Sequence, residues 1–392
     1  MLQRLTFFLL VAMNMAVLRL CAQQACPSFA DTPDPNEAQL MLTVNSTDDP
    51  QEQIAALDKF AKEHPDSKFM GCVNEYYASA NLKLKDYDKS IEFGEKDLAL
   101  NYQDLNLLFT LMRAYASSNK VSDTIFEVIN KVPDQARVET SSPAHPLKAT
   151  DDQWAKIQAD ARELAKASHD YAVWAFFQVI PRVTDPAKQI QALNSFVKTY
   201  PETEKDNATQ INTLYFDAYR MQGNYDKTIE FGDKVIATDP SNVRVLNTLG
   251  LIYSFALPHP SPEKGAAYAQ KALAATQGLK KPEGADDAAF KKDQTNQLGM
   301  AHLMLGYAAL IRAEKTGKLV PAIDELKLAS TLLEGNPPLQ GQALYYLGFA
   351  YERGTPANHR GAIESLNRSS SLPGPMQGQA RALLAKVKAA IK

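Results

Sequence analysis

The chain has 392 residues, of which 45% are hydrophobic and 22% are charged, so it carries enough apolar material for a large buried core. Alanine, leucine, lysine, glutamine and glutamate are common, which favours helix over strand. The formal net charge of -3 argues against the basic, phosphate-neutralising surface of a nucleic-acid-binding protein, so no nucleic-acid partner is predicted.

Residues 1–22 have the pattern of an export signal peptide. Arg4 precedes an apolar run over residues 5–18, and a site for cleavage follows after Ala22. The run is shorter than the roughly 20 residues that a membrane-spanning helix needs. No later segment of the sequence is apolar enough to cross a membrane, so the protein is expected to be exported, periplasmic or secreted, with no transmembrane segment after signal removal.

Two alternatives for this N-terminal region stay open. The apolar run could remain attached as an anchor, or Cys21 could carry a lipid, and either would associate the protein with the cell envelope. Leu20 argues against the lipid, because such sites favour a small residue before the cysteine.

Signal removal would leave two cysteines, Cys26 and Cys72. Oxidising conditions outside the cytoplasm favour a disulfide between them. The alternative is a free, buried Cys72 with Cys26 on a loose N-terminus, and sequence alone cannot supply the geometry that would decide. Two cysteines without a Cys-x-x-Cys motif do not predict a zinc site.

Beyond a polar, proline-rich and mobile segment at 23–35, the chain is predicted to be helical almost throughout. Asp49-Pro50 is the first strong helix start, and His64-Pro65 ends that helix. The longest gap is a loop over residues 132–150, and its role is not evident. Further helices are expected at 67–84, 87–100, 104–117, 121–131, 152–180, 187–199, 206–222, 225–238, 242–256, 262–276, 287–313, 320–333, 339–352, 358–370 and 376–391.

The sequence contains an internal duplication of about 136 residues. Residues 86–96 and 224–234 differ only by Asp/Asn, Ser/Thr and Glu/Asp exchanges, and Tyr171-Ala172 recurs as Tyr307-Ala308. A recurrence at a fixed spacing predicts a repeat architecture. The expected organisation is a helical-repeat domain at 36–392, with copies at 50–185 and 186–320 and a partial third copy at 321–392.

Small and aromatic residues recur at fixed places in these hairpins. Leu249-Gly250-x-x-Tyr253 and Leu347-Gly348-x-x-Tyr351 lie on first helices, and Ala362-Ile363 lies on a second helix. This pattern resembles the tetratricopeptide repeat (TPR) over most of residues 36–391. The resemblance implies an all-α fold, an α-solenoid of about eight TPR-like helical hairpins with a C-terminal capping helix.

The copies at 67–100 and 206–238 depart from the TPR pattern at Gly94 and Gly232, where the family prefers a large residue. A glycine inside a helix costs roughly 1 kcal/mol relative to alanine. Its recurrence suggests a tight crossing of helices there. The alternative is a ligand lying against the bare backbone.

No constellation of catalytic residues is evident in the sequence, so no enzyme activity, cofactor or metal is predicted. The sequence contains neither a His-Glu-x-x-His motif, nor a phosphate-binding glycine loop, nor a Gly-x-Ser-x-Gly turn. Its six histidines are scattered, and none lies within four residues of another. An enzyme site assembled from distant helices is the least favoured alternative.

If the hairpins follow TPR geometry, their first helices line a concave surface. The side chains carried onto that surface mix aromatic, arginine and amide groups, a composition suited to binding a peptide. The family's clamp for a terminal carboxylate is not matched, so binding of chaperone tails is not predicted. The predicted partner-binding residues are Glu75, Lys83, Asn106, Phe109, Arg113, Asp217, Arg220, Arg244, Asn247, Tyr345, Phe349 and Arg353.

The function predicted from the sequence is therefore that of an exported, non-enzymatic scaffold that binds a protein or peptide on its concave face. The alternative is an envelope protein of the same architecture that binds a carbohydrate or small molecule, with exposed Trp and Tyr platforms. The sequence identifies neither the partner nor the oligomeric state.

Overall fold

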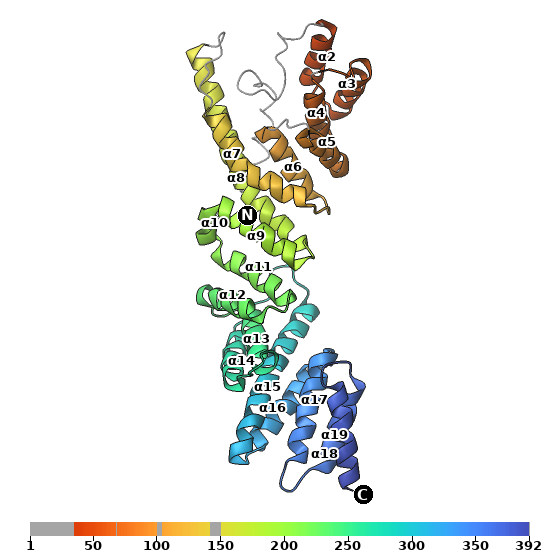
Figure 1. Cartoon of the computed structure of the whole chain (residues 1–392), viewed down its shortest axis with the longest axis vertical. Helices are drawn as coiled ribbons and strands as arrows, with labels where there is room; N and C mark the ends of the chain where they lie inside the picture. Colours follow the sequence, from red (N-terminus) through yellow and green to blue (C-terminus); the bar gives the residue numbers. More distant parts are fainter. Residues whose placement is uncertain (1–34, 68, 100–103, 142–149, 392) are drawn as a thin grey trace. The chain divides into compact units, whose positions relative to one another are not determined.

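The computed structural model describes residues 35–67, 69–99, 104–141 and 150–391 (Figure 1). Within these ranges the chain is all-α, its helices pack mainly on their neighbours in sequence, and no residue is in a strand. The predicted all-α fold of successive helical hairpins is confirmed. The predicted signal peptide lies outside the described residues, and no described helix is long and apolar enough to cross a bilayer.

The chain divides into two compact units, residues 1–205 and 206–392. The helices that begin in the first unit are α2 (Pro35–Ser46), α3 (Pro50–Glu63), α4 (Met70–Lys83), α5 (Tyr87–Ala99), α6 (Leu105–Ser117), α7 (Asp123–Thr140), α8 (Asp151–Val179), the 3₁₀ turn η2 (Ile180–Arg182), α9 (Pro186–Thr199) and the short α10 (Pro201–Asp206).

Two helices of the first unit, α3 and α9, begin with the same local chemistry. The Asp49 side chain accepts hydrogen bonds from two backbone N–H groups of the first turn of α3, and Asp185 does the same for α9. A proline follows each cap, where its missing N–H costs nothing. The Nε2 group of Gln53 donates to the Val44 carbonyl at 3.1 Å, and that of Gln189 donates to the Ile180 carbonyl at 3.2 Å, so both helices are tied to the preceding helix in the same way.

Ten helical segments begin in the described part of the second unit. They are α11 (Ala208–Met221), α12 (Tyr225–Thr238), α13 (Val243–Leu251), the π-helical turn η3 (Ile252–Ala256), α14 (Pro262–Gln277), α15 (Asp287–Thr316), α16 (Val320–Leu332), α17 (Pro337–Glu352) and α18 (His359–Ser371), with α19 (Gln377–Ala390) packed on α18 at the C-terminal end.

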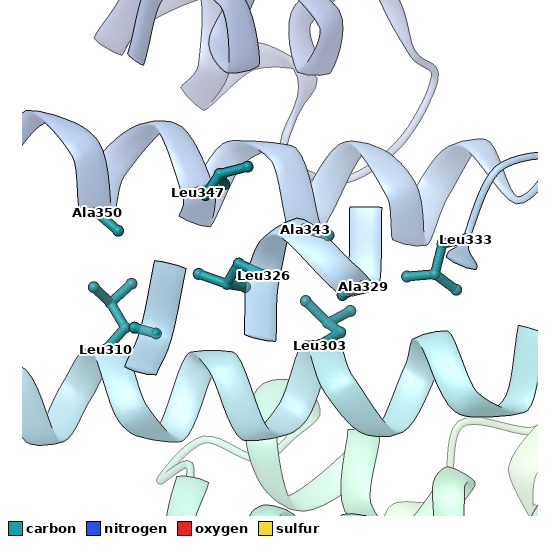
Figure 2. Packing of buried hydrophobic residues seen from close by; sticks show 9 residues of the cluster. Leu303, Leu310, Leu326, Ala329, Leu333, Ala343, Leu347 and Ala350 are labelled. Atoms are coloured by element: carbon teal, nitrogen blue, oxygen red, sulfur yellow. The ribbon is translucent and has the colours of Figure 1, made fainter. Parts of the chain in front are cut away.

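The core of the second unit runs from one hairpin to the next. Figure 2 shows α15 and α17 on either side of α16, with Leu326 of α16 between Leu310 and Leu347. All three leucines are buried. One hairpin could not bury these side chains alone, so each depends on its neighbours, as in other repeat proteins.

Gly94 and Gly232 are explained by close packing of the next hairpin. A Cβ atom at Gly94 would lie 2.6 Å from Cδ2 of Leu111, and one at Gly232 would lie 2.8 Å from Cδ2 of Leu249. The leucine of the following first helix therefore fills the space that a side chain would occupy. The alternative of a ligand against this backbone is wrong, because both places are already filled.

The predicted loop at 132–150 is partly wrong. Helix α7 continues through Pro133 to Thr140, and residues 142–149 lie outside the described ranges. Proline lacks the N–H that would bond to the carbonyl four residues earlier, here that of Ile129. The Tyr200 hydroxyl donates to this carbonyl at 2.6 Å, so the helix continues without an unsatisfied group.

Candidate functional site

The clearest candidate site in the first unit is an aromatic cluster between α6 and α8. Phe109 and Arg113 lie one turn apart on α6, and the Arg113 guanidinium lies 5.8 Å from the centroid of the Phe109 ring. Tyr171 of α8 contacts Phe109 edge-to-face at 5.0 Å between ring centroids, and Trp174 lies 5.0 Å from Tyr171. The four side chains form one group, named here the Arg113 cluster.

The Arg113 cluster is both partly open and positively charged. Trp174 is 47% exposed, whereas Phe109 and Arg113 are half-buried. Burial raises the pKa of Tyr171 to about 12, with a smaller opposite effect from Arg113, so its hydroxyl stays neutral at physiological pH. Arg113 itself makes no ion pair with any described residue.

A second aromatic cluster lies in the second unit. Phe255 of η3, Tyr307 of α15 and Tyr346 of α17 contact one another, with ring centroids 4.7–5.9 Å apart. Burial raises the pKa of Tyr307 and of Tyr346, so both hydroxyls remain protonated. The π-helical turn in which Phe255 lies is a local departure from α geometry of a kind often found at functional sites.

Beside this second cluster, Arg353 repeats the arginine–phenylalanine arrangement of α6. Its guanidinium lies 4.9 Å from the centroid of Phe349, one turn earlier on α17. Unlike Arg113, it donates to the Glu314 carboxylate at 2.8 Å. Tyr345 is half-buried and contacts both Tyr346 and Phe349. The charge of Arg353 is thus already paired within the protein.

Three predicted residues of α11 and α13 form one charged group, in which two arginines share the carboxylate of Asp217. Arg244 donates to both carboxylate oxygens of Asp217, at 2.5 and 3.1 Å, and the Nε of Arg220 lies 3.7 Å from the same carboxylate. Both arginines are exposed, and Asp217 is half-buried. This group can present hydrogen-bond donors to a partner, but the partner must compete with Asp217.

Two predicted binding residues are buried, and their assignment to an open surface is corrected here. Asn247 has no exposed surface, and its Nδ2 group donates to the backbone carbonyl and the side-chain oxygen of Gln297 on α15. Glu75 is 4% exposed. Of the other predicted residues of the first unit, Lys83 is exposed at the end of α4 and Asn106 is half-buried on α6.

Aromatic residues of α8, η3, α15 and α17 complete both clusters, and the predicted binding residues do not include Tyr171, Trp174, Phe255, Tyr307 or Tyr346. The recurrence of Tyr171 as Tyr307 was the sequence signal that could have identified them. No such recurrence marks Trp174, because the corresponding residue of the second copy is Leu310.

Cys72 is disulfide-bonded. Cys26 lies outside the described residues, so the pairing of these two cysteines stays a prediction.

A separate cleft of about 720 Å³ lies in the second unit, beside the first half of α15 and the turn between α16 and α17. Its lining includes Lys291, Lys292 and Asn296, and the Asn296 side chain accepts a hydrogen bond from Asn336 at 2.9 Å. None of the predicted binding residues lines this cleft.

Histidine–carboxylate contacts occur at separate places among the described residues, each between two helices. His169 contacts Glu202 at 3.0 Å, His302 contacts Glu325 at 2.6 Å, and His359 contacts Glu352 at 2.9 Å. None of these residues lines the cleft. Within the described ranges, no three histidine, cysteine or carboxylate side chains are grouped so that they could hold a metal ion.

Comparisons with known proteins add little to this geometry. No protein-family model matches the chain, and no curated protein matches it. Among solved structures, the crystal structure of yeast Tom70 matches 90% of this chain and 87% of its own chain, with 13% sequence identity and a TM-score of 0.25. That score is too low to support a function, so the fold assignment rests on this chain's own helices.

Proposed function

We propose that the protein is a non-enzymatic scaffold that binds a protein or peptide partner on the first helices of its hairpins. The observation that carries this proposal is the Arg113 cluster, in which an arginine and a tryptophan are presented at a half-open surface. Tryptophan, tyrosine and arginine dominate the binding energy of many protein interfaces. The two aromatic residues bury much area and lose little side-chain entropy, and arginine offers five N–H donors in a planar group.

A photoreactive amino acid in place of Asn106, on the same helix as Phe109 and Arg113, tests this proposal in living cells. We expect a covalent adduct with a protein, and we expect Trp174→Ala to reduce its yield severalfold. The matched control places the photoreactive group at Lys388, on the exposed side of α19. A lack of protein adducts at Asn106, or adducts indifferent to Trp174→Ala, would contradict the proposal.

The second candidate function is carbohydrate binding, which the exposed indole of Trp174 beside Tyr171 favours. A flat, half-exposed aromatic ring can stack on the apolar face of a sugar. Titration with neutral oligosaccharides separates the two functions. Saturable quenching of the Trp174 fluorescence by such a sugar, together with failure of the crosslink, would select the carbohydrate.

We also propose that the protein is exported, with the signal peptide removed after Ala22. The support is the charged and apolar pattern of residues 1–22. Mass spectrometry of the mature N-terminus tests it, and a chain beginning at Gln23 is expected. A lipid-modified Cys21 would instead indicate an envelope-anchored protein, and an intact Met1 would contradict signal removal.

A further inference from the structure

The arginines that lie over aromatic rings differ in whether a carboxylate of the protein already pairs with them. Arg244 lies over Phe216 and binds Asp217, and Arg353 lies over Phe349 and binds Glu314. Arg113 lies over Phe109 without any acidic partner among the described residues. Two of these three sites therefore hold an arginine–carboxylate pair on an aromatic surface, and the third has the same arrangement without the carboxylate.

The surroundings of Arg113 favour an incoming carboxylate. Arg113 lowers the pKa of Tyr171 against the larger, opposite effect of burial, and its guanidinium pairs with no carboxylate among the described residues. A guanidinium packed on an aromatic face keeps its N–H edge available for a two-bond contact with a carboxylate. Because Arg113 is half-buried, such a contact is less screened by water than one at an exposed side chain.

The indole of Trp174 defines what should accompany the carboxylate. It is 47% exposed and adjoins Tyr171, which in turn contacts the ring of Phe109 beside the guanidinium. A ligand that reaches Arg113 across this surface can bury an aromatic or large aliphatic group on the indole. A charged group alone would leave that apolar area in water.

We propose that the Arg113 cluster binds an acidic peptide segment, in which one carboxylate binds the Arg113 guanidinium and an adjacent aromatic side chain packs on Trp174. This inference rests on the proposed function, and it adds the chemistry of the partner. Charge complementarity selects an acidic segment, and the half-exposed indole selects one with an aromatic neighbour.

Two capped peptides, acetyl-Gly-Glu-Phe-Gly-amide and its glutamine analogue, test the proposal on the full chain. The protein has two tryptophans, so the indole N–H signals in an NMR spectrum are few, and Trp154→Phe identifies that of Trp174. We expect the glutamate peptide to shift the Trp174 signal with an affinity about tenfold higher than that of the glutamine peptide, which corresponds to about 1.4 kcal/mol.

Substitution of Arg113 tests whether this residue causes the preference for the glutamate peptide. In Arg113→Gln the two peptides should bind within about twofold of each other, and Arg113→Lys should retain part of the difference. Arg353→Gln is the matched control, because its guanidinium is already paired with Glu314, and it should leave the preference unchanged. An unchanged Trp154 indole signal verifies that the variants are folded.

Three results would overturn the proposal: equal binding of both peptides by the unsubstituted protein, a preference that persists in Arg113→Gln, or tighter binding of methyl glucuronide than of the glutamate peptide. If the preference is missing while crosslinks at Asn106 still form, this inference fails and the proposed function stands. If the crosslinks are also missing, both fail.

Discussion

The hydroxyl of Tyr200 allows α7 to continue through a proline. It occupies the place of the N–H that Pro133 lacks, and it donates to the Ile129 carbonyl from a side chain that is fully buried. Tyr200 is far from α7 in sequence, so the continuation of that helix depends on a tertiary contact. This is why proline alone was a misleading sign of a helix end.

Removal of this hydroxyl should destabilise the first unit. Tyr200→Phe leaves the buried Ile129 carbonyl without a donor, and we expect the free energy of unfolding to fall by about 1–3 kcal/mol, measured by urea denaturation. Pro133→Ala restores an N–H at the position of the proline, so it should recover much of the loss in the double variant. Additive effects of the two substitutions would show that the hydroxyl has no such role.

Glu139 provides a second residue-scale prediction, on pH. It accepts hydrogen bonds from the backbone N–H of Leu105 and from Gln135, at 2.7 and 2.9 Å, yet burial, with a further contribution from nearby Asp104, raises its pKa from 4.5 to about 7. The fold therefore favours the protonated form. Its contribution to stability is fully present below about pH 4.5, decreases as the pH rises to 7, and is lost above that value.

Urea denaturation across pH 4.5–8 measures this contribution. The unsubstituted protein should lose up to about 3 kcal/mol relative to Glu139→Gln over this interval, since one pKa unit corresponds to about 1.4 kcal/mol. The glutamine variant keeps a neutral side chain of similar shape and should lack this dependence. Parallel pH profiles for the two proteins would refute the assignment to Glu139.

At the scale of one helix, two leucines of α16 show that burial depends on the face of the helix and not on the residue type. Leu326 and Leu328 are two positions apart, but Leu326 is fully buried between α15 and α17 whereas Leu328 is 43% exposed. The helical repeat of 3.6 residues turns the two side chains to different faces. Identical residues on one helix therefore contribute very different amounts to stability.

Alanine substitution of both leucines measures this difference. Leu326→Ala should lower the free energy of unfolding by about 2–5 kcal/mol, through lost burial and the cavity left between three helices. Leu328→Ala is the matched control and should cost less than about 1 kcal/mol. Comparable losses for the two variants in urea denaturation would contradict the packing described for α16.

At the largest scale, the stability of each unit depends on each of its hairpins covering the next. Ala380 and Val387 of α19 pack on Ala362 and Leu366 of α18, so α19 closes the core at the C-terminal end of the second unit. In a stack of repeats such an end helix keeps the last apolar face from water.

Deletion of residues 377–392 should therefore have a local effect. We expect amide hydrogen exchange to accelerate in α18 and α17, because their apolar faces become exposed, while α11 and α12 keep their protection. The control Lys388→Ala changes an exposed residue of α19 and should alter neither region. Loss of protection throughout the second unit would indicate a cooperative globule rather than a stack of hairpins.

The sequence by itself determined the all-helical class, most of the helices and the hairpin pattern. These features follow from contacts within about four residues: the spacing of apolar side chains, aspartate caps such as Asp49, and the glycine and proline residues between helices. The duplication and the export signal are also read from the sequence, and both stay predictions.

Only the tertiary structure decided which of the predicted binding residues are available. Asn247 is hydrogen-bonded to Gln297, Arg353 is ion-paired with Glu314, and Arg244 is ion-paired with Asp217. In each case the partner lies on another helix. Arg113 has the same local pattern and no acidic partner among the described residues. Whether an arginine is free depends on which helices stack side by side, because a charge is neutralised by what is near in space and not by what is near in sequence.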